Sequence, residues 1–286
     1  MAMKTLLKWA GNKQKLAGQI DEAFSGPCQG TYFEPFVGSA AVFLHRRERG
    51  TIGEAVLSDV NPRLIEMHRA VRDAPADVME ELARLPGEGW REAYYDVRDA
   101  FNDSRQVGPA HAARFIWLNR AGFNGLYREN KSGRYNVPVG RYAKLRLPGE
   151  EVFLRISRLL EGTELVVADF NDILRRAGKG DQVYCDPPYV PLNQASAVFV
   201  SYSAGGFDLG AQQELANGSL RAAFRGAEVV LSNHDLPIVR QQLYPETSGF
   251  RVVARPMVAR PISRKAASRK AVSEVIAAIG PLRHVA

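Results

Sequence analysis

The chain has 286 residues, enough for one large domain or for a core domain with a smaller companion. It holds no run of about 18 uncharged apolar residues and starts without a long apolar leader, so we expect neither a membrane-spanning helix nor a signal peptide. Two cysteines, Cys28 and Cys185, are too few for a disulfide framework or a zinc site. We therefore expect a cytoplasmic protein without a metal.

The charge balance favours a polyanionic partner. Lys and Arg number 38 against 31 Asp and Glu, which gives a formal net charge of +7 and a pI near 9.5. Neutralising phosphates releases condensed counterions, although many basic proteins bind no nucleic acid. The basic residues crowd into residues 119–146 and 260–270, and this clustering points to those segments as contact regions.

Residues 30–73 read as a strand–helix–strand–helix unit. The pattern predicts a strand around residues 32–33, a glycine turn and a helix over 39–49. A second strand ends at Ser58, and Asn61-Pro62 starts another helix, because proline is tolerated in a first helical turn. Such a unit implies a parallel sheet with right-handed crossovers.

The middle of the chain interrupts this sheet. Residues 62–119 read as mostly helical, and "AARFIWLNRAG" predicts a helix that ends at Gly122. Residues 123–140 mix glycine, proline and asparagine with Arg, Lys and Tyr, which is typical of a functional loop. Strands are predicted again within residues 164–170, 182–186, 227–235 and 250–258. The fold class is therefore α/β, with an inserted helical and loop module.

The stretch "FEPFVGSAAVF" leads from a strand through Gly38 into a helix, as nucleotide-binding sites of doubly wound sheets do. It lacks the full G-x-G-x-x-G pattern, which disfavours a dinucleotide oxidoreductase. Asp59 ends the next strand, where an acid can accept hydrogen bonds from ribose hydroxyls. A loop-forming Gly38 and a helix-capping Asp59 remain an equally good interpretation of these residues alone.

The segment "DPPY", residues 186–189, follows the predicted strand at the edge where open α/β sheets bind ligands. The Asp186 carboxylate and the Pro187 carbonyl are acceptors, and Pro187 and Pro188 supply no competing donor. Two fixed acceptors beside the Tyr189 ring suit a planar substrate with an exocyclic amino group. They would position that nitrogen and stabilise the positive charge that develops on it. Taken alone, the segment can also be a rigid turn.

Another polar group, Asn233, His234 and Asp235, follows a strand at the same edge. Neighbours in sequence rarely form a catalytic triad and no G-x-S-x-G elbow is present, so we expect a structural His234. The remaining histidines lack metal-ligand spacing, which again predicts no metal.

Six segments follow one another along the chain: "LLKWAGNKQKL", "FEPFVGSAAVF", "LSDVNP", "FNGLYREN…GRYNVPVGRY", "VYCDPPYVPL" and "LSNHD". Together they resemble Dam-type DNA adenine-N6 methyltransferases, in the same order and over nearly the whole chain. The resemblance implies a Rossmann-like methyltransferase sheet with helices on both faces. It places the S-adenosylmethionine-binding catalytic domain in residues 1–60 and 150–286. The inserted target-recognition domain, with a β-hairpin, would occupy residues 61–149.

The resemblance also implies the site residues. S-adenosylmethionine would be held by Trp9, Lys13, Glu34, Phe36, Gly38, Asp59 and Asp186. Asp186, Pro187, Pro188 and Tyr189 would grip an adenine flipped out of duplex DNA, at a cost of a few kcal/mol, for direct in-line transfer to N6. A GATC site would be read by Lys8, Asn124, Leu126, Arg128, Pro138 and Arg141. Arg134 and Lys131 could instead contact phosphates, and so could Arg141.

The sequence departs from this family at three places. Asn12 stands where a second glycine usually follows "WAG", and Ala40 replaces the second glycine of the F-x-G-x-G loop. In the basic hairpin at 260–270, "RKAA" replaces a turn rich in Asn and Gly. The first two changes can alter how closely the backbone approaches the cofactor.

The leading hypothesis is a DNA adenine methyltransferase that acts as a monomer at the nucleoid, with a restriction endonuclease as a conceivable partner. Methylation of cytosine-N4 or of RNA adenine is the near alternative, since D-P-P-Y chemistry serves any exocyclic amine. A non-catalytic DNA-binding relative is the alternative from another class, although pure binding would not need residues 186–189.

Overall fold

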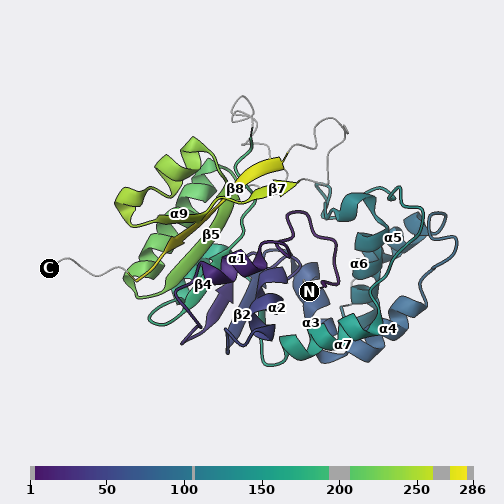
Figure 1. The fold of residues 1–286 in the computed structure, drawn as a ribbon. Coiled ribbons are helices and arrows are strands. Elements are labelled where there is room, and N and C mark those ends of the chain that lie inside the picture. Colours follow the sequence, from purple (N-terminus) through teal and green to yellow (C-terminus); the bar gives the residue numbers. More distant parts are fainter. Residues whose placement is uncertain (1–3, 105–106, 193–206, 260–270, 282–286) are drawn as a thin grey trace. The chain divides into compact units, whose positions relative to one another are not determined.

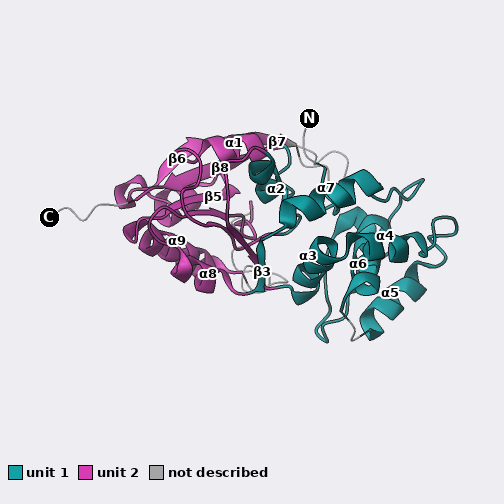
Figure 2. Cartoon of the chain, turned by 90° about the horizontal axis from the view of Figure 1, so that it is seen from below, with its two compact units in different colours: residues 1–15, 38–48, 61–167 teal, residues 16–37, 49–60, 168–286 magenta. Residues whose placement is uncertain are grey.

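A computed structural model describes residues 4–104, 107–192, 207–259 and 271–281 (Figure 1). The chain divides into two compact units (Figure 2). Unit 1 consists of Met1–Lys15, Gly38–Glu48 and Asn61–Val167. Unit 2 consists of Leu16–Val37, Arg49–Val60 and Ala168–Ala286. The assignment of a catalytic and a target-recognition domain concerns function and stays a prediction.

Unit 2 is built on a sheet. Its strands are β1 (Tyr32–Glu34), β2 (Ala55–Asp59), β4 (Gln182–Cys185), β5 (Glu228–His234), β6 (Arg251–Ala254), β7 (Met257–Ala259) and β8 (Ala271–Ile279). They pair in the order β2-β1-β4-β5-β8-β6, with β7 on β8. The pairs among β2, β1, β4 and β5 are parallel, and β8 runs antiparallel to its neighbours. The predicted parallel sheet is confirmed.

Helices cover this sheet. Figure 2 shows α8 (Phe170–Arg176) and α9 (Leu209–Phe224) on one side of it and α1 (Ala17–Glu22) on the other. Short π and 3-10 turns follow at Val239–Leu243 and Glu246–Ser248. Strands β4 and β5 are buried along their whole length, because residues on both sheet faces are covered.

The strand order sets where a ligand can bind. From β1 the chain adds β2 on one side and later β4 on the other, so the order reverses at β1. Open α/β sheets bind ligands outside the carboxyl ends of the strands at such a switch point. Glu34 ends β1, Asp59 ends β2 and Asp186 directly follows β4, which puts all three at this edge of the sheet.

Unit 1 is mainly helical. It contains α2 (Ala41–Glu48), α3 (Pro62–Asp73), α4 (Pro75–Ala83), α5 (Tyr94–Asp103), α6 (Pro109–Ala121), a 3-10 turn (Phe123–Gly125), α7 (Glu150–Leu160) and the strand β3 (Glu164–Val167). Helix α6 is buried on nearly all sides and packs against α3, α4 and α5. Its end before Gly122 matches the prediction.

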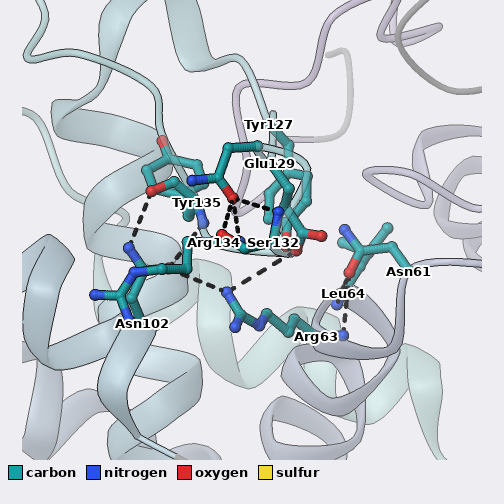
Figure 3. Close-up of polar contacts among 10 residues, drawn as sticks. Asn61, Arg63, Leu64, Asn102, Tyr127, Glu129, Ser132, Arg134 and Tyr135 are labelled. Atoms are coloured by element: carbon teal, nitrogen blue, oxygen red, sulfur yellow. Dashed lines mark hydrogen bonds and ion pairs between the residues drawn. The ribbon is translucent and has the colours of Figure 1, made fainter.

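The predicted start of α3 is also confirmed. The Asn61 side chain accepts hydrogen bonds from the backbone N–H groups of Arg63 (3.1 Å) and Leu64 (3.3 Å), as Figure 3 shows for Leu64. Pro62 occupies the first turn, where its missing N–H has no helical partner to lose.

Two boundaries differ from the predictions. Helix α2 begins at Ala41 rather than at residue 39, because Ala40 has a left-handed φ of 58° that a helix cannot include. The single strand expected within residues 250–258 is two strands, β6 and β7, divided at Pro256, which has no N–H to donate to a ladder. Strand β8 was not predicted from the sequence. The basic segment 260–270 lies outside the described residues.

Candidate active site

The D-P-P-Y segment is held by hydrogen bonds from side chains of neighbouring elements in unit 2. Asn233, on β5, accepts a hydrogen bond from the Val190 N–H (3.1 Å), and His234 Nδ1 bonds to the Val190 carbonyl. Gln212, on α9, donates to the Pro188 carbonyl (2.6 Å). The segment is thus anchored at its far end, and the predicted structural role of His234 agrees with this contact.

Tyr189 is held at its hydroxyl and at its ring. The hydroxyl donates to Glu274 Oε2 (3.0 Å), and the ring lies edge-on to His234 at a centroid distance of 4.9 Å and an angle of 79°. Burial, followed by the charge of Asp186, raises the pKa of Tyr189 well above its usual value. The phenol is therefore neutral and acts as a donor.

Cys185, the residue before Asp186, is no nucleophile. It is fully buried, and burial, with the charges of Glu34 and Asp186, raises the pKa of its thiol far above the ordinary value. A thiol is nucleophilic as the thiolate, so a protonated Cys185 cannot form a covalent intermediate at neutral pH.

The carboxyl end of β1 carries an acid and an aromatic cluster. Glu34 is buried and accepts a hydrogen bond from the Tyr32 hydroxyl (2.6 Å). Phe36 stacks on Phe170 at 5.6 Å and 23°, and Phe207 meets Phe36 edge-on at 5.6 Å and 83°. Phe170 and Phe207 were not selected from the sequence, although Phe170 is the last residue of the predicted strand segment 164–170.

In unit 1 the predicted cofactor residue Gly38 is enclosed by side chains. It has a φ of 46°, and a Cβ atom there would lie 2.7 Å from Nε1 of Trp9. His68, on α3, bonds through Nε2 to the Gly38 carbonyl (2.9 Å). Burial lowers the pKa of His68 to about 4, so the ring is neutral and Nε2 carries the donated proton. Lys13 is buried and donates to the Gly11 carbonyl (2.6 Å).

Residues 128–136 of unit 1 form a small hairpin. Glu129 pairs with Tyr135, the Asn136 N–H donates to the Arg128 carbonyl (3.0 Å), and the Asn130 side chain accepts from the N–H groups of the turn, including that of Arg134 (3.0 Å). This is the hairpin that the fold prediction placed in the insert.

The hairpin is fastened to the helices of unit 1 (Figure 3). Asn102, on α5, accepts from the Tyr135 N–H (2.7 Å) and donates to the Tyr135 carbonyl (3.0 Å). Arg63 lies 3.9 Å from the Glu129 carboxylate. Tyr127 stacks on Phe115 at 5.4 Å and 20°. The loop is therefore held in a defined conformation by its contacts with the helices of unit 1.

The predicted DNA-reading residues all belong to unit 1. Arg128 is exposed, and its Nε donates to the Asn136 side chain (2.6 Å), which orients the guanidinium. Pro138 and Arg141 are exposed, and Leu126 is half-buried. Asn124 has a left-handed φ of 56° inside the 3-10 turn. The roles of these residues stay predictions.

Asn119 joins the N-terminal segment to this loop. Its Oδ1 accepts from the Lys8 N–H (2.8 Å), and its Nδ2 donates to the carbonyls of Lys8 (3.0 Å) and Gly125 (3.0 Å). The Lys8 ammonium lies 3.9 Å above the Tyr142 ring, and burial with the charges of Arg120 and Arg146 lowers its pKa. The sequence analysis did not select Asn119, because its role depends on a residue 111 positions away.

No helix among the described residues is long and apolar enough to cross a membrane. Within the same residues, no group of three or more His, Cys, Asp or Glu side chains is arranged to hold a metal ion.

Comparisons with known proteins agree with the geometry. Residues 9–252 match the family model of the D12 class N6 adenine-specific DNA methyltransferases. The chain is 34% identical to the type II methyltransferase M.MjaIII of Methanocaldococcus jannaschii, over 90% of this chain and 93% of that protein. It is 35% identical to the DNA adenine methylase of Vibrio cholerae (83% and 84% covered) and 34% identical to that of Escherichia coli (83% and 83%). This chain belongs to the D12 class of N6 adenine-specific DNA methyltransferases.

Proposed function

We propose that the protein moves a methyl group from S-adenosylmethionine to N6 of an adenine flipped out of duplex DNA, within the sequence GATC. The observation that carries this proposal is the anchored Asp186–Tyr189 segment at the carboxyl end of β4, beside the switch point of the sheet. Its acceptors and its ring suit a planar amine, and the family is specific for adenine.

The residues at the switch point fit S-adenosylmethionine, which supplies an electrophilic methyl group on a cationic sulfur. Asp59 ends β2, where its carboxylate can accept from ribose hydroxyls, and Phe36 with Phe170 offers an aromatic surface for the adenosine. The buried carboxylate of Glu34 suits the positive charge of the cofactor. Trp9, Lys13 and Gly38 of unit 1 stay cofactor residues by resemblance.

The target adenine would meet Asp186, Pro187 and Tyr189. The Asp186 carboxylate and the Pro187 carbonyl accept the two N6–H bonds, which localises the nitrogen lone pair toward the electrophile. When bound, S-adenosylmethionine would supply the methyl group for the new N–C bond, and its sulfur would keep the electrons of the broken C–S bond. The proton that N6 gives up would pass from the Asp186 side to water. Asp186 stabilises the positive charge on N6 during the transfer. Stacking on Tyr189 offsets part of the few kcal/mol needed to flip the base.

Sequence choice would come from the hairpin and the N-terminal segment of unit 1. Arg128, already oriented by Asn136, suits a bidentate contact with a guanine edge. Leu126 and Pro138 suit the thymine methyl, and Lys8 the first guanine. Arg141 contacts either a base or a phosphate, and Lys131 and Arg134 suit phosphates.

The proposal also covers the setting of the reaction. A DNA substrate implies work at the nucleoid in the cytoplasm, and one chain carries both the D-P-P-Y segment and the hairpin, as a monomeric enzyme needs. A cognate restriction endonuclease would fit the similarity to a type II methyltransferase.

Restriction protection tests the function. Unmethylated duplex DNA is incubated with the protein and S-adenosylmethionine, then cut with a nuclease specific for methylated GATC and with one that methylation blocks. We expect cleavage by the first and protection from the second, and neither with Asp186→Ala, which should retain much of its duplex affinity. Unchanged patterns with wild-type protein would refute GATC, and methyl incorporation into other DNA, cytosine or RNA would then identify the substrate. A near-normal rate in Asp186→Ala would refute the mechanism.

A further inference from the structure

We infer that Glu274 is a positioning residue for the transfer, because it fixes the ring that receives the flipped base. The inference rests on the proposed function, in which Tyr189 stacks on the target adenine. Glu274 touches neither reactant in this arrangement and acts through the Tyr189 hydroxyl.

The contact is a hydrogen bond sheltered from solvent. Glu274 Oε2 lies 3.0 Å from the Tyr189 hydroxyl, and the Glu274 residue is only 8% exposed. The Tyr189 phenol stays protonated because burial and the nearby charge of Asp186 raise its pKa. A hydrogen bond from a neutral phenol to a carboxylate is stronger than one between two neutral groups.

The sheet places Glu274 where this contact can form. Glu274, on β8, is paired with His234 on the antiparallel neighbour β5, and its N–H donates to the Pro256 carbonyl (2.9 Å). In Figure 1, β8 runs alongside β5. Adjacent strands thus supply the acceptor for the Tyr189 hydroxyl and the His234 ring that packs against the Tyr189 ring.

These contacts restrain different motions of Tyr189. The edge-on contact with His234, at 4.9 Å and 79°, limits rotation of the ring about its axis. The bond to Glu274 ties the distal end of the side chain to β8, which limits its swing about χ1. Gln212 holds the adjacent Pro188 carbonyl, so it restrains the backbone beside Tyr189 rather than the Tyr189 side chain. A stacking surface that is already ordered stabilises the transition state more than one that must be ordered when the base binds, because no conformational entropy is lost at that step.

A double-mutant cycle separates positioning from general support of the fold. The variants are Glu274→Ala, Tyr189→Phe and the combination, assayed for kcat and KM on a GATC duplex. We expect Glu274→Ala to lower kcat about tenfold with KM within about twofold, as a small misplacement of a reacting group does. In the Tyr189→Phe background the same change should cost less than about twofold, because the hydroxyl through which Glu274 acts is gone.

Base stacking gives a spectroscopic readout. With 2-aminopurine at the target adenine, the flipped base should be quenched by Tyr189 in the wild-type protein and brighter in Glu274→Ala. Glu274→Gln keeps an acceptor oxygen and should restore most of the quenching. Glu228→Ala is the matched control, since Glu228 is an equally buried β5 carboxylate that bonds to Ser25 and Gln182. It should lower thermal stability without altering the fluorescence.

Additive effects in the cycle, or equal fluorescence in wild-type protein and Glu274→Ala, would overturn the inference. If Glu274→Ala does not fold, Glu274→Leu tests the same bond with the volume retained. Failure of the proposed function is seen separately, as a wild-type protein that methylates no GATC duplex. In that case the positioning role can still be tested by the mobility of the Tyr189 ring, measured by ¹³C-tyrosine relaxation in the free protein. Unchanged mobility in Glu274→Ala would refute that role.

Discussion

The indole of Trp9 fills the space beside the Cα of Gly38. A Cβ atom at position 38 would lie 2.7 Å from Nε1 and 2.8 Å from Cδ1 of that ring, closer than real side chains approach. The φ of Gly38, 46°, also disfavours any side chain. The glycine is therefore required by a neighbouring predicted cofactor residue as well as by the turn.

We expect Gly38→Ala to destabilise the protein by about 1–3 kcal/mol and to weaken S-adenosylmethionine binding, because the indole must move. Urea unfolding and calorimetric titration of the cofactor measure the two effects. Gly18→Ala, in α1, is the control: apart from its chain neighbours and the backbone of its own helix, no atom of the described residues lies within 4 Å of its would-be Cβ, and alanine favours a helix by about 0.5–1 kcal/mol. Equal behaviour of the two variants would contradict the role given to Trp9.

Ala40 stands where the sequence resemblance predicts a second glycine, and its φ of 58° is left-handed. That conformation costs a residue with a Cβ roughly 1–2 kcal/mol, whereas glycine costs about 0.5–1 kcal/mol in backbone entropy. We expect Ala40→Gly to be neutral or slightly stabilising in urea unfolding. Ala41→Gly, one residue later inside α2, should destabilise by about 1 kcal/mol. The same loss in both variants would show that Ala40 is unstrained.

The sheet was predictable where a strand coincides with a local signal. β1, β2, β4 and β5 are apolar runs that end at turn-forming or acidic residues, and their bounds fell close to the predicted ones. β8 was missed because "AVSEVIAAI" suits a helix as well as a strand. Its pairing with β5, which is distant in sequence, decides between them.

In the candidate site, too, residues within a local motif could be predicted from the sequence, whereas residues that depend on distant contacts could not. Asp186 and Tyr189 stand in one short motif, so their chemistry could be argued from sequence. Glu274 lies 85 residues from Tyr189, and nothing in its own surroundings distinguishes it from any acid on a strand. Gln212 sits on a helix, where a glutamine usually faces solvent. Residues that act by holding other residues become visible only after the chain has folded.

His68 predicts a pH dependence of stability. Burial lowers its pKa from 6.5 to about 4, so the folded protein binds fewer protons than the unfolded chain between these pH values. Stability should therefore be fully present above pH 6.5 and fall as the pH drops toward 4, by up to about 3 kcal/mol for this group. The pKa of His111 is also lowered to about 4, by burial and then by the charges of Arg63 and Arg114, so His111 should add a smaller loss in the same direction.

The change His68→Gln tests this assignment. Its amide can still donate to the Gly38 carbonyl but does not titrate in this range. We expect the slope of unfolding free energy against pH between 4 and 6.5 to become smaller, with His111 still contributing to it. An unchanged slope would mean that His68 is charged in the folded protein.

Asn119 connects both predicted DNA-reading segments through Lys8 and Gly125. Asn119→Asp would turn a donor into an acceptor that faces two carbonyls, and the N-terminal segment should separate from the loop. We expect affinity for a GATC duplex to fall about tenfold or more, with a smaller loss on a duplex without GATC, as fluorescence anisotropy would measure. Asn217→Asp, on the exposed face of α9, should change neither. Equal losses on both duplexes would assign Asn119 to the fold alone.

Arg128 and Lys131 lie on one hairpin, and we expect them to contribute differently: Arg128 to the choice of sequence and Lys131 to affinity for any duplex. The Asn136 side chain orients the Arg128 guanidinium. The hairpin also has a backbone hydrogen bond from the Asn136 N–H to the Arg128 carbonyl, which does not involve the guanidinium and should survive in Arg128→Ala. That variant should lose about 1–3 kcal/mol on GATC and little on other duplexes, which relaxes specificity. Lys131→Ala should weaken binding to all duplexes alike and reduce the slope of log affinity against log salt by about one. Anisotropy titrations on GATC and on single-base variants, at several salt concentrations, separate these outcomes. An equal loss of affinity on all duplexes in Arg128→Ala would make Arg128 a phosphate contact, because removing a base-reading side chain should weaken binding mainly on the sequence that it reads.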